Sequence, residues 1–203
     1  MHMSWHRFRR SLPGQGQSPD YAKKRYALEH LKQLNQAGVI DLYYLDEAGF
    51  SLEPKVPYGW QEIGQYEPIA SQRSQQLNVL GFMHRAGRLE SYVSEQSITG
   101  AVVAHCLDTY FATVAIPTVI VADQAPVHRC RAVQDKRAEW AARDVYLFDL
   151  PSYSPELNLI EILWRFMKYQ WIEFSAYESW QALVYGVEKI LKGFGKEFVI
   201  NFA

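Results

Sequence analysis

The segment Thr118-Val119-Ile120-Val121-Ala122-Asp123 is the most informative short stretch of the chain. Five uncharged residues, three of them Val or Ile, come directly before an acid. This composition is typical of a central parallel strand that is covered on both faces. A carboxylate at the end of such a strand is costly to bury unless something pairs with it. The stretch therefore predicts an α/β fold with a functional acid at one edge of the sheet.

Both strands and helices are expected on either side of this strand. A Pro- and Gly-containing segment, residues 53–72, is expected to be an ordered loop. Three consecutive strands followed by alternating strands and helices imply a mixed five-stranded sheet flanked by helices. Further strands are expected over 42–45, 77–84, 89–93 and 145–150, and helices over 21–38, 100–114, 127–143, 155–171 and 176–193.

Charge is divided unevenly along the 203 residues. The totals of 21 Lys+Arg and 22 Asp+Glu give a net charge of −1, which by itself argues against a protein that coats nucleic acid. However, residues 1–35 carry a net charge of +5 and residues 36–203 carry −6. We therefore expect a basic arm or linker over 1–35 and one folded domain over 36–203. The arm is either a solvated tail or a segment that contacts phosphates through Arg7, Arg9 and Arg10.

Several functional classes lack their sequence signals. Cys106 and Cys130 have no paired spacing, so neither a disulfide framework nor a zinc site is expected. The longest apolar uncharged stretch, residues 109–122, is shorter than the roughly 20 residues that span a bilayer. With no signal peptide at the start, we expect a cytoplasmic protein without membrane contact. Motifs of NTPases and covalent hydrolases are also missing.

Three acids stand at positions where α/β proteins collect functional groups. Asp46 is expected at the end of the first strand, Asp123 at the end of the central strand, and Glu161 in the first turns of the long helix. Carboxylates that are brought together repel one another, and a divalent cation removes the repulsion. Oxygen ligands of this kind suit Mg²⁺ or Mn²⁺. Two such ions would form a phosphodiester site in which one activates the attacking oxygen and the other stabilises the leaving oxygen.

Each acid also has an ordinary structural interpretation. Asp46 could cap a turn, because Asp-Glu-x-Gly is a common turn composition, and Asp123 could form a turn with its own backbone. Glu161 could pair with Arg165 four residues later on an exposed helix face. The order of the elements, which brings all three acids toward one region, favours the metal site over these separate explanations.

Three segments around the acids resemble the signature blocks of the IS630/Tc1/mariner transposases. The resemblance covers residues 36–203, and the third block is the most specific. The first block is Leu45-Asp46-Glu47 with Gly49-Phe50; the second is Asp123, Ala125, Pro126 and His128; the third is Pro151, Tyr153-Ser154-Pro155-Glu156-Leu157-Asn158, Ile160-Glu161 and Trp164. Similarity to the IS630 branch adds Trp60, Gly64, Gly193-Phe194-Gly195 and Ile200-Asn201-Phe202.

The resemblance implies an RNase H-like fold in which Asp46, Asp123 and Glu161 are catalytic acids that bind two Mg²⁺ or Mn²⁺ ions. Glu156 is the rival for the third position. It also implies cleavage of DNA at transposon ends and transfer of the 3′-hydroxyl to target DNA, at TA dinucleotides in relatives. A homodimer is expected, because two transposon ends must be held together.

The chain departs from the family pattern at a few positions. Gln124 stands where Asn is usual, Leu159 stands where Pro is usual, and Asp123 and Glu161 are 38 residues apart, which is slightly wide. None of these changes removes a metal ligand. The usual N-terminal helix-turn-helix region has no counterpart beyond the basic arm, so we expect the main DNA-binding module to be absent from this chain.

Other residues are candidates for supporting roles. Glu47, Gln124 and His128 could orient the acids or contact DNA, although a structural histidine at a helix start is as common. Arg165 and Lys168 could meet phosphates or could simply pair with nearby acids. Trp60 is the aromatic residue best placed for DNA contact. Two other functions stay open: an RNase H-like nuclease that only hydrolyses, and a non-catalytic remnant that binds DNA or a transposase.

Overall fold

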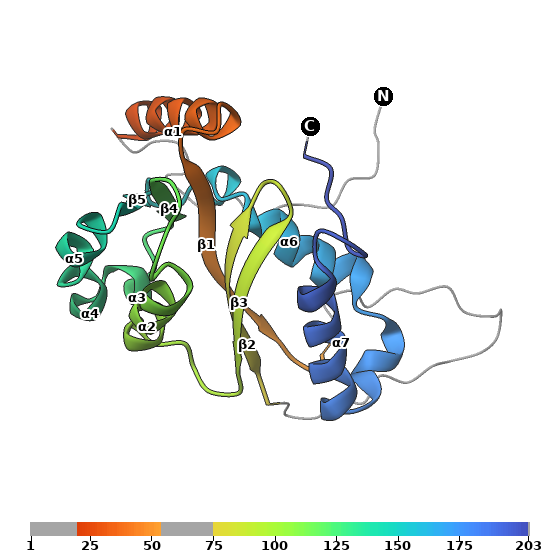
Figure 1. Cartoon of the computed structure of the whole chain (residues 1–203). Coiled ribbons are helices and arrows are strands. Elements are labelled where there is room, and N and C mark those ends of the chain that lie inside the picture. The colour runs from red at the N-terminus through yellow and green to blue at the C-terminus, as the bar shows by residue number, and fades with distance from the viewer. Residues whose placement is uncertain (1–19, 54–74, 203) are drawn as a thin grey trace, which may run out of the picture.

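A five-stranded mixed sheet forms the centre of the computed structural model, which describes residues 20–53 and 75–202 (Figure 1). The strand order is β3-β2-β1-β4-β5, and the predicted mixed sheet is confirmed. Strands β1, β4 and β5 are parallel to one another, whereas β2 is antiparallel to both β1 and β3. The strands are β1 (Asp41–Phe50), β2 (Leu77–His84), β3 (Arg88–Ser94), β4 (Thr118–Ala122) and β5 (Val145–Asp149).

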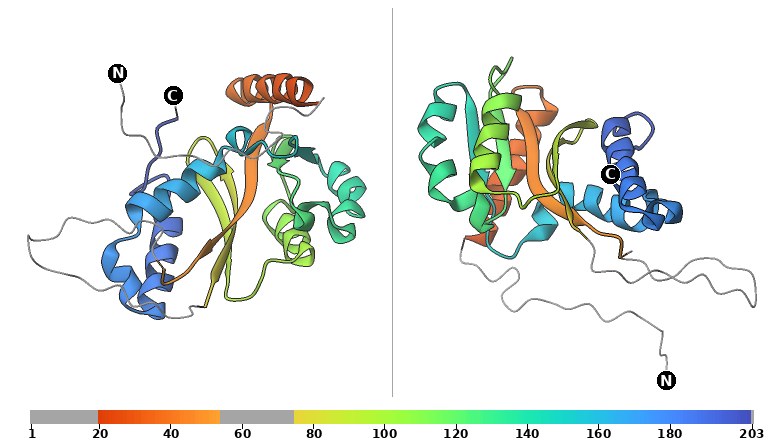
Figure 2. Two further views of the ribbon diagram at one scale, coloured as in Figure 1. Left: turned by 180° about the vertical axis from the view of Figure 1, so that it is seen from behind. Right: turned by 90° about the horizontal axis from the view of Figure 1, so that it is seen from below.

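Helices cover both faces of this sheet, so the molecule has three layers (Figure 2). One apolar cluster lies between the sheet and α1 (Tyr21–Gln36), α6 (Ile160–Phe166) and α7 (Trp180–Gly193). The other lies between the sheet and the short helical segments on the opposite face. Those segments are α2 (Gly100–Tyr110), α3 (Pro126–Arg129), α4 (Arg131–Gln134) and α5 (Arg137–Ala141).

The side chains of β1 alternate between these two clusters. Tyr44 belongs to the cluster under α6 and α7, and Leu45 belongs to the cluster under α2. Because successive side chains of a strand point to opposite faces, Asp46 is directed toward α6 and Glu47 toward α3. The central strand β4 is buried at all five positions, as its composition predicts.

The prediction that the first strand ends at Leu45 and that Asp46 stands at its end is wrong. Strand β1 continues to Phe50, because Asp46 to Phe50 stay paired with Gly81 to Leu77 of β2. The parallel partner β4 stops earlier, at the pair Leu45–Ala122. Asp46 is therefore the first residue of β1 beyond its parallel pairing, and the segment 46–49 is not a turn.

Four predicted helices also differ in extent. The region 127–143 forms three short helices, with an extended residue, Cys130, between the first two. Helix α2 ends at Tyr110 rather than near residue 114. The long helix after Pro155 is divided into a 3₁₀ turn η1 (Pro155–Leu157), α6, and a π-helical turn η2 (Met167–Trp171). The last helix is preceded by a separate 3₁₀ turn η3 (Phe174–Glu178).

Some predictions fall on residues that the structure does not describe. Arg7, Arg9, Arg10, Trp60 and Gly64 lie outside the described ranges. Helix α1 (Tyr21–Gln36) lies almost entirely in the segment 1–35 that the charge division assigns to the arm, and its Leu28 is fully buried in the core. No helix within 20–53 or 75–202 is long and apolar enough to cross a membrane.

Candidate active site

The pairing of β1 with β4 places two aspartates side by side at one edge of the sheet. Leu45 and Ala122 form the last pair of the parallel ladder. The next residue in each strand direction is an acid, Asp46 in β1 and Asp123 after β4. Because parallel strands run in the same direction, residues that follow paired positions lie at the same level. The register thus brings together two of the three predicted acids.

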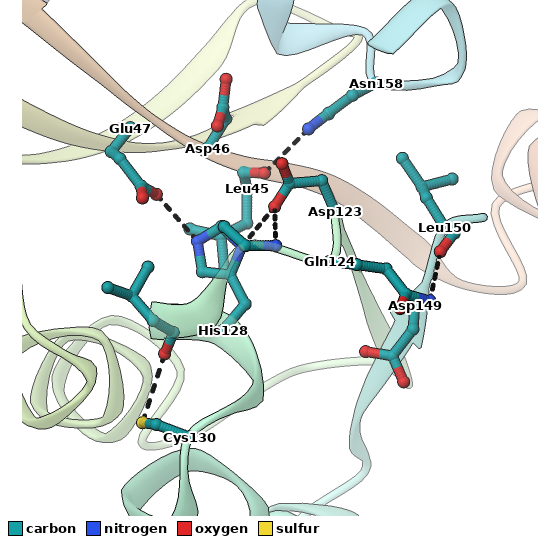
Figure 3. A network of polar contacts seen from close by, with 12 residues as sticks. Leu45, Asp46, Glu47, Asp123, Gln124, His128, Cys130, Asp149, Leu150 and Asn158 are labelled. Carbon is teal, nitrogen blue, oxygen red and sulfur yellow. Dashed lines mark hydrogen bonds and ion pairs between the residues drawn. The ribbon is translucent and has the colours of Figure 1, made fainter. Parts of the chain in front are cut away.

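The segment that carries the third acid is attached to β1 at this level. The side-chain amide Nδ2 of Asn158 donates a hydrogen bond to the Leu45 carbonyl oxygen over 3.0 Å (Figure 3). Six residues later, the indole Nε1 of Trp164 donates to Asp46 Oδ2 over 3.1 Å. Both bonds are buried. Glu161 lies between the two donors, in the first turn of α6, so these bonds hold its helix against Asp46.

The charge of Asp46 is strongly disfavoured in this arrangement. Its side chain is buried, and this burial, together with the neighbouring charges of Glu161, Glu47 and Asp123, raises its pKa to about 8. Glu161 makes the largest of these carboxylate contributions. The pKa of Glu161 is itself raised by desolvation, although Lys168 lowers it and Asp123 raises it further. The three predicted acids therefore form one group of mutually repelling carboxylates.

Asp123 is held by a different set of partners. Its Oδ1 atom accepts hydrogen bonds from the backbone N–H of Ala125 at 2.9 Å and from His128 Nδ1 at 2.7 Å (Figure 3). The imidazole of His128 is completely buried, and its Nε2 atom lies 2.9 Å from Glu47 Oε2. His128 thus connects Asp123 to Glu47, the residue that follows Asp46.

Opposite pKa shifts accompany this bridge. Burial alone would lower the pKa of His128, but its contacts with Asp123 and Glu47 outweigh burial and raise the pKa to about 10. Burial alone would raise the pKa of Asp123, but the bonds from His128 and Ala125 lower it below the usual value. The geometry fits a charged imidazolium that bonds to Asp123 and lies beside the Glu47 side chain.

A divalent cation fits the chemistry of these carboxylates. Within the described ranges, no three His, Cys, Asp or Glu side chains are grouped closely enough to form a ligand set as they stand. Glu161 and Asp123 nevertheless repel the buried Asp46, and the hydrogen bonds named above use only one oxygen of Asp123. Hard oxygen donors of this kind suit Mg²⁺ or Mn²⁺.

Glu156, the rival for the third position, lies in the η1 turn before α6. Its Oε1 atom accepts a hydrogen bond of 2.9 Å from the Tyr21 hydroxyl of α1. Glu161, in contrast, is the carboxylate that raises the pKa of Asp46 most. These contacts favour Glu161 as the partner of Asp46.

The remaining candidates lie around the acids in distinct ways. Gln124 donates from Nε2 to the Leu150 carbonyl oxygen over 2.8 Å, so it joins the ends of β4 and β5. Arg165 and Lys168 line a cavity of about 490 Å³ together with Glu161, and Lys32 of α1 also belongs to its lining. The Lys168 amine lies 5.4 Å from the centre of the Phe50 ring. The lining of this cavity thus combines three cations with Glu161.

Sequence reasoning assigned no role to three residues that shape the site. Asn158 and Trp164 belong to the recognised motif, but only the fold shows that they bond to β1. A buried indole N–H needs an acceptor, so a Trp three residues after a candidate acid can indicate that this helix bonds to a polar group on a neighbouring element. Gly81 of β2 pairs with Asp46, and a side chain there would collide with Trp164. No local signal marks this glycine.

Comparison with known proteins gives the family. Residues 41–184 match the family model described as DDE superfamily endonuclease, and this span contains Asp46, Asp123 and Glu161. The chain belongs to the DDE superfamily endonucleases. No curated protein matches it. The predicted resemblance to the transposases of this superfamily is thereby confirmed.

Solved structures show the same fold as this DDE superfamily chain. One match is the Mos1 transposase in a paired-end complex with the left transposon end. The TM-score between the two chains is 0.60 at 15% sequence identity, over 96% of this chain and 61% of that chain. For the catalytic domain of Mos1 mariner transposase alone, the TM-score is 0.55 at 13% identity, over 90% of this chain and 84% of that chain. The RNase H-like fold is confirmed. The chain spans about 61% of the length of the Mos1 protein in the paired-end complex.

Proposed function

We propose that this DDE superfamily domain is the catalytic domain of an IS630-type transposase. It cleaves phosphodiester bonds at transposon ends and transfers the resulting 3′-hydroxyl to target DNA. The observation that carries the proposal is the pairing of Leu45 with Ala122, which puts Asp46 and Asp123 at one sheet edge beside the helix of Glu161. The resemblance of the motifs around these acids to the IS630 branch supports the choice of branch.

In this proposal Asp46, Asp123 and Glu161 hold two Mg²⁺ or Mn²⁺ ions. When bound, such ions activate the attacking oxygen and stabilise the leaving oxygen of an in-line displacement. The protein's own residues orient the carboxylates: His128 and Ala125 hold one oxygen of Asp123, and Glu47 holds the far side of His128. The Mos1 mariner paired-end complexes with Mn and with Mg, both similar to this chain in fold, support the use of a divalent ion.

In this proposal the DNA backbone approaches the acids through the neighbouring cavity, whose cations contact its phosphate groups. Lys32, Arg165 and Lys168 line it next to Glu161 and supply positive charge for phosphate groups. Contacts through Arg7, Arg9, Arg10 and Trp60 stay predictions. The solved Mos1 structures include complexes with transposon-end DNA and a strand transfer complex, which supports both DNA substrates. A homodimer, insertion at TA and action in the bacterial cytoplasm at the nucleoid complete the proposal.

Nicking of supercoiled plasmid DNA in Mn²⁺ tests the catalytic assignment. We expect the full chain to nick the plasmid and Asp123→Ala to be inactive. Asp149→Asn is the matched control, because Asp149 ends the adjacent strand β5 and pairs with Arg137 at 2.6 Å. Normal nicking by Asp123→Ala would contradict the assignment of the acids.

A strand-transfer assay separates transposition from the alternatives. Pre-cleaved DNA with an exposed 3′-hydroxyl at the element end is incubated with target plasmid. Joined product is expected from a transposase. Nicking without joining would identify a hydrolytic nuclease, and neither reaction in Mg²⁺ or Mn²⁺ would identify a non-catalytic remnant.

A further inference from the structure

Trp164 makes the direct contact between the helix of the third acid and the first acid. Its side chain is 3% exposed, and its indole N–H, the one hydrogen-bond donor of the side chain, is directed at Asp46 Oδ2. Glu161 lies three residues earlier in α6, so about one helical turn separates it from Trp164. A shift of the indole would therefore move Glu161 and the Asp46 carboxylate relative to each other.

Gly81 provides the space that this contact needs. It pairs directly with Asp46 in the antiparallel β1–β2 ladder and lies on the face that α6 covers. A Cβ atom at Gly81 would lie 2.8 Å from Trp164 Cη2 and 2.9 Å from Ile160 Cδ1. Both distances are too short for carbon atoms in contact. The helix approaches the sheet this closely because the paired residue has no side chain.

We propose that Trp164 is a positioning residue that sets the Asp46 carboxylate against Glu161, and that Gly81 is required for its placement. The inference rests on the proposed function, since it concerns how two metal-binding acids are arranged. The indole fixes Asp46 Oδ2. It also fixes the depth at which α6 packs on β1 and β2.

The test compares two tryptophans of the same kind. Trp140 is also fully buried, and its indole N–H also bonds to a carboxylate, Asp108 Oδ1 at 2.8 Å, but it lies in α5 on the opposite face of the sheet. Trp164→Phe and Trp140→Phe each remove one buried N–H donor and keep an aromatic ring. Circular dichroism reports the fold of the full chain, and electron paramagnetic resonance of free Mn²⁺ reports its affinity for the ion.

We expect Trp164→Phe to weaken Mn²⁺ binding by about tenfold or more, as is typical when a group that orients a metal ligand is lost. Trp140→Phe should leave the affinity unchanged, even where it lowers the stability. Gly81→Ala keeps the indole N–H but displaces it, so it should weaken Mn²⁺ binding as well. If Trp164→Phe does not fold, Gly81→Ala decides the question.

The outcomes separate this inference from the proposed function. Wild-type Mn²⁺ binding that is lost in Asp123→Ala but unchanged in both Trp164→Phe and Gly81→Ala would overturn the positioning role alone. A wild-type chain that binds no Mn²⁺ would overturn both proposals. An equal loss of affinity in Trp140→Phe and Trp164→Phe would also overturn the positioning role, because the effect would then follow stability.

Discussion

At the scale of single residues, two aspartates at the same edge of one sheet experience opposite environments. Asp46 is buried and faces other carboxylates, which raises its pKa to about 8. Asp123 accepts hydrogen bonds from His128 and Ala125, which lower its pKa despite partial burial. The two environments differ because Asp46 is covered by α6, whereas Asp123 leads directly into the turn that carries His128. A metal ion would complete the charge balance on the side of Asp46.

The choice between Glu161 and Glu156 gives a prediction at this scale. Glu161→Gln removes a charge that would stabilise bound cations, so we expect the rate of Mn²⁺-dependent nicking to fall by more than about a hundredfold. Glu156→Gln keeps an acceptor for the Tyr21 hydroxyl and should nick at close to the wild-type rate. Rates of plasmid nicking at fixed Mn²⁺ measure both. The reverse result would make Glu156 the third acid.

His128 gives a second residue-scale prediction. His128→Ala leaves the carboxylates of Glu47 and Asp123 without their shared partner. We expect the free energy of unfolding to fall by about 2 kcal/mol, which is less than for a completely buried ion pair because Asp123 is partly exposed. Urea denaturation at pH 7 measures this. His105→Ala, at an exposed position of α2, serves as the control and should change stability by less than about 0.5 kcal/mol.

At the scale of elements, unequal strand lengths create the site. The ten-residue β1 extends beyond the end of its parallel neighbour β4, which has only five residues. The far half of β1 is held by β2, so Asp46 and Glu47 stay in regular strand geometry and point to opposite faces. Helix α6 then contacts Asp46 through Trp164, and α3 contacts Glu47 through His128. The stability of the helices over these faces depends on their N-terminal caps and on the burial of their apolar sides.

Helix α7 illustrates this dependence and provides a testable case. The Ser179 hydroxyl caps the helix by accepting a hydrogen bond from the Ala182 N–H at 3.2 Å. Ser179→Ala should lower the free energy of unfolding by about 1 kcal/mol, because it leaves that N–H without its cap. Ser175→Ala, at an exposed position in η3, should have little effect. Urea denaturation of both variants checks the prediction, and equal losses would contradict it.

At the scale of the whole molecule, charge clusters far from the acids join separate elements. Asp108 of α2 accepts hydrogen bonds from Trp140 at 2.8 Å and Arg143 at 3.0 Å, and it also pairs with Lys136. Together these contacts attach α2 to the 136–143 region on the same face of the sheet. Burial alone would raise the pKa of Asp108, but the three hydrogen bonds outweigh it and lower the pKa.

This cluster predicts a pH dependence of stability. Because the pKa of Asp108 is lower in the folded chain, its stabilising contribution is present above the ordinary carboxyl pKa near 4 and is lost as the pH falls through the lower folded value. At pH 7, Asp108→Asn should therefore be less stable than wild type by about 2 kcal/mol. The difference should shrink below about pH 4, as urea denaturation at pH 7 and pH 3 would show.

The exposed pair of Asp135 and Arg131 is the control for this measurement. Its two side chains are 63% and 91% exposed, so water and salt screen their attraction. Asp135→Asn should change the free energy of unfolding by no more than about 0.5 kcal/mol at either pH. A difference for Asp108→Asn that grows as the pH falls would contradict the assigned direction of its pKa.

Much of the fold followed from local patterns in the chain. Strands β2 and β4 have the predicted bounds, and α2 begins at the predicted residue, Gly100. The end of β1 could not be read locally, because Asp-Glu-Ala-Gly has a turn composition and only pairing with β2 keeps it extended. Likewise, the helix after Pro155 is interrupted at Asn158, whose extended backbone lets its side chain bond to Leu45.

By itself, then, the sequence determined the kinds and order of the elements and singled out three candidate acids, because periodicity, caps and buried runs are properties of neighbouring residues. Only the tertiary structure decided how these parts meet. The Leu45–Ala122 register, the bridge through His128, the bond from Trp164 to Asp46 and the space above Gly81 all join residues that are distant along the chain or lie on different elements. Such contacts depend on packing across the whole sheet, which no local pattern contains.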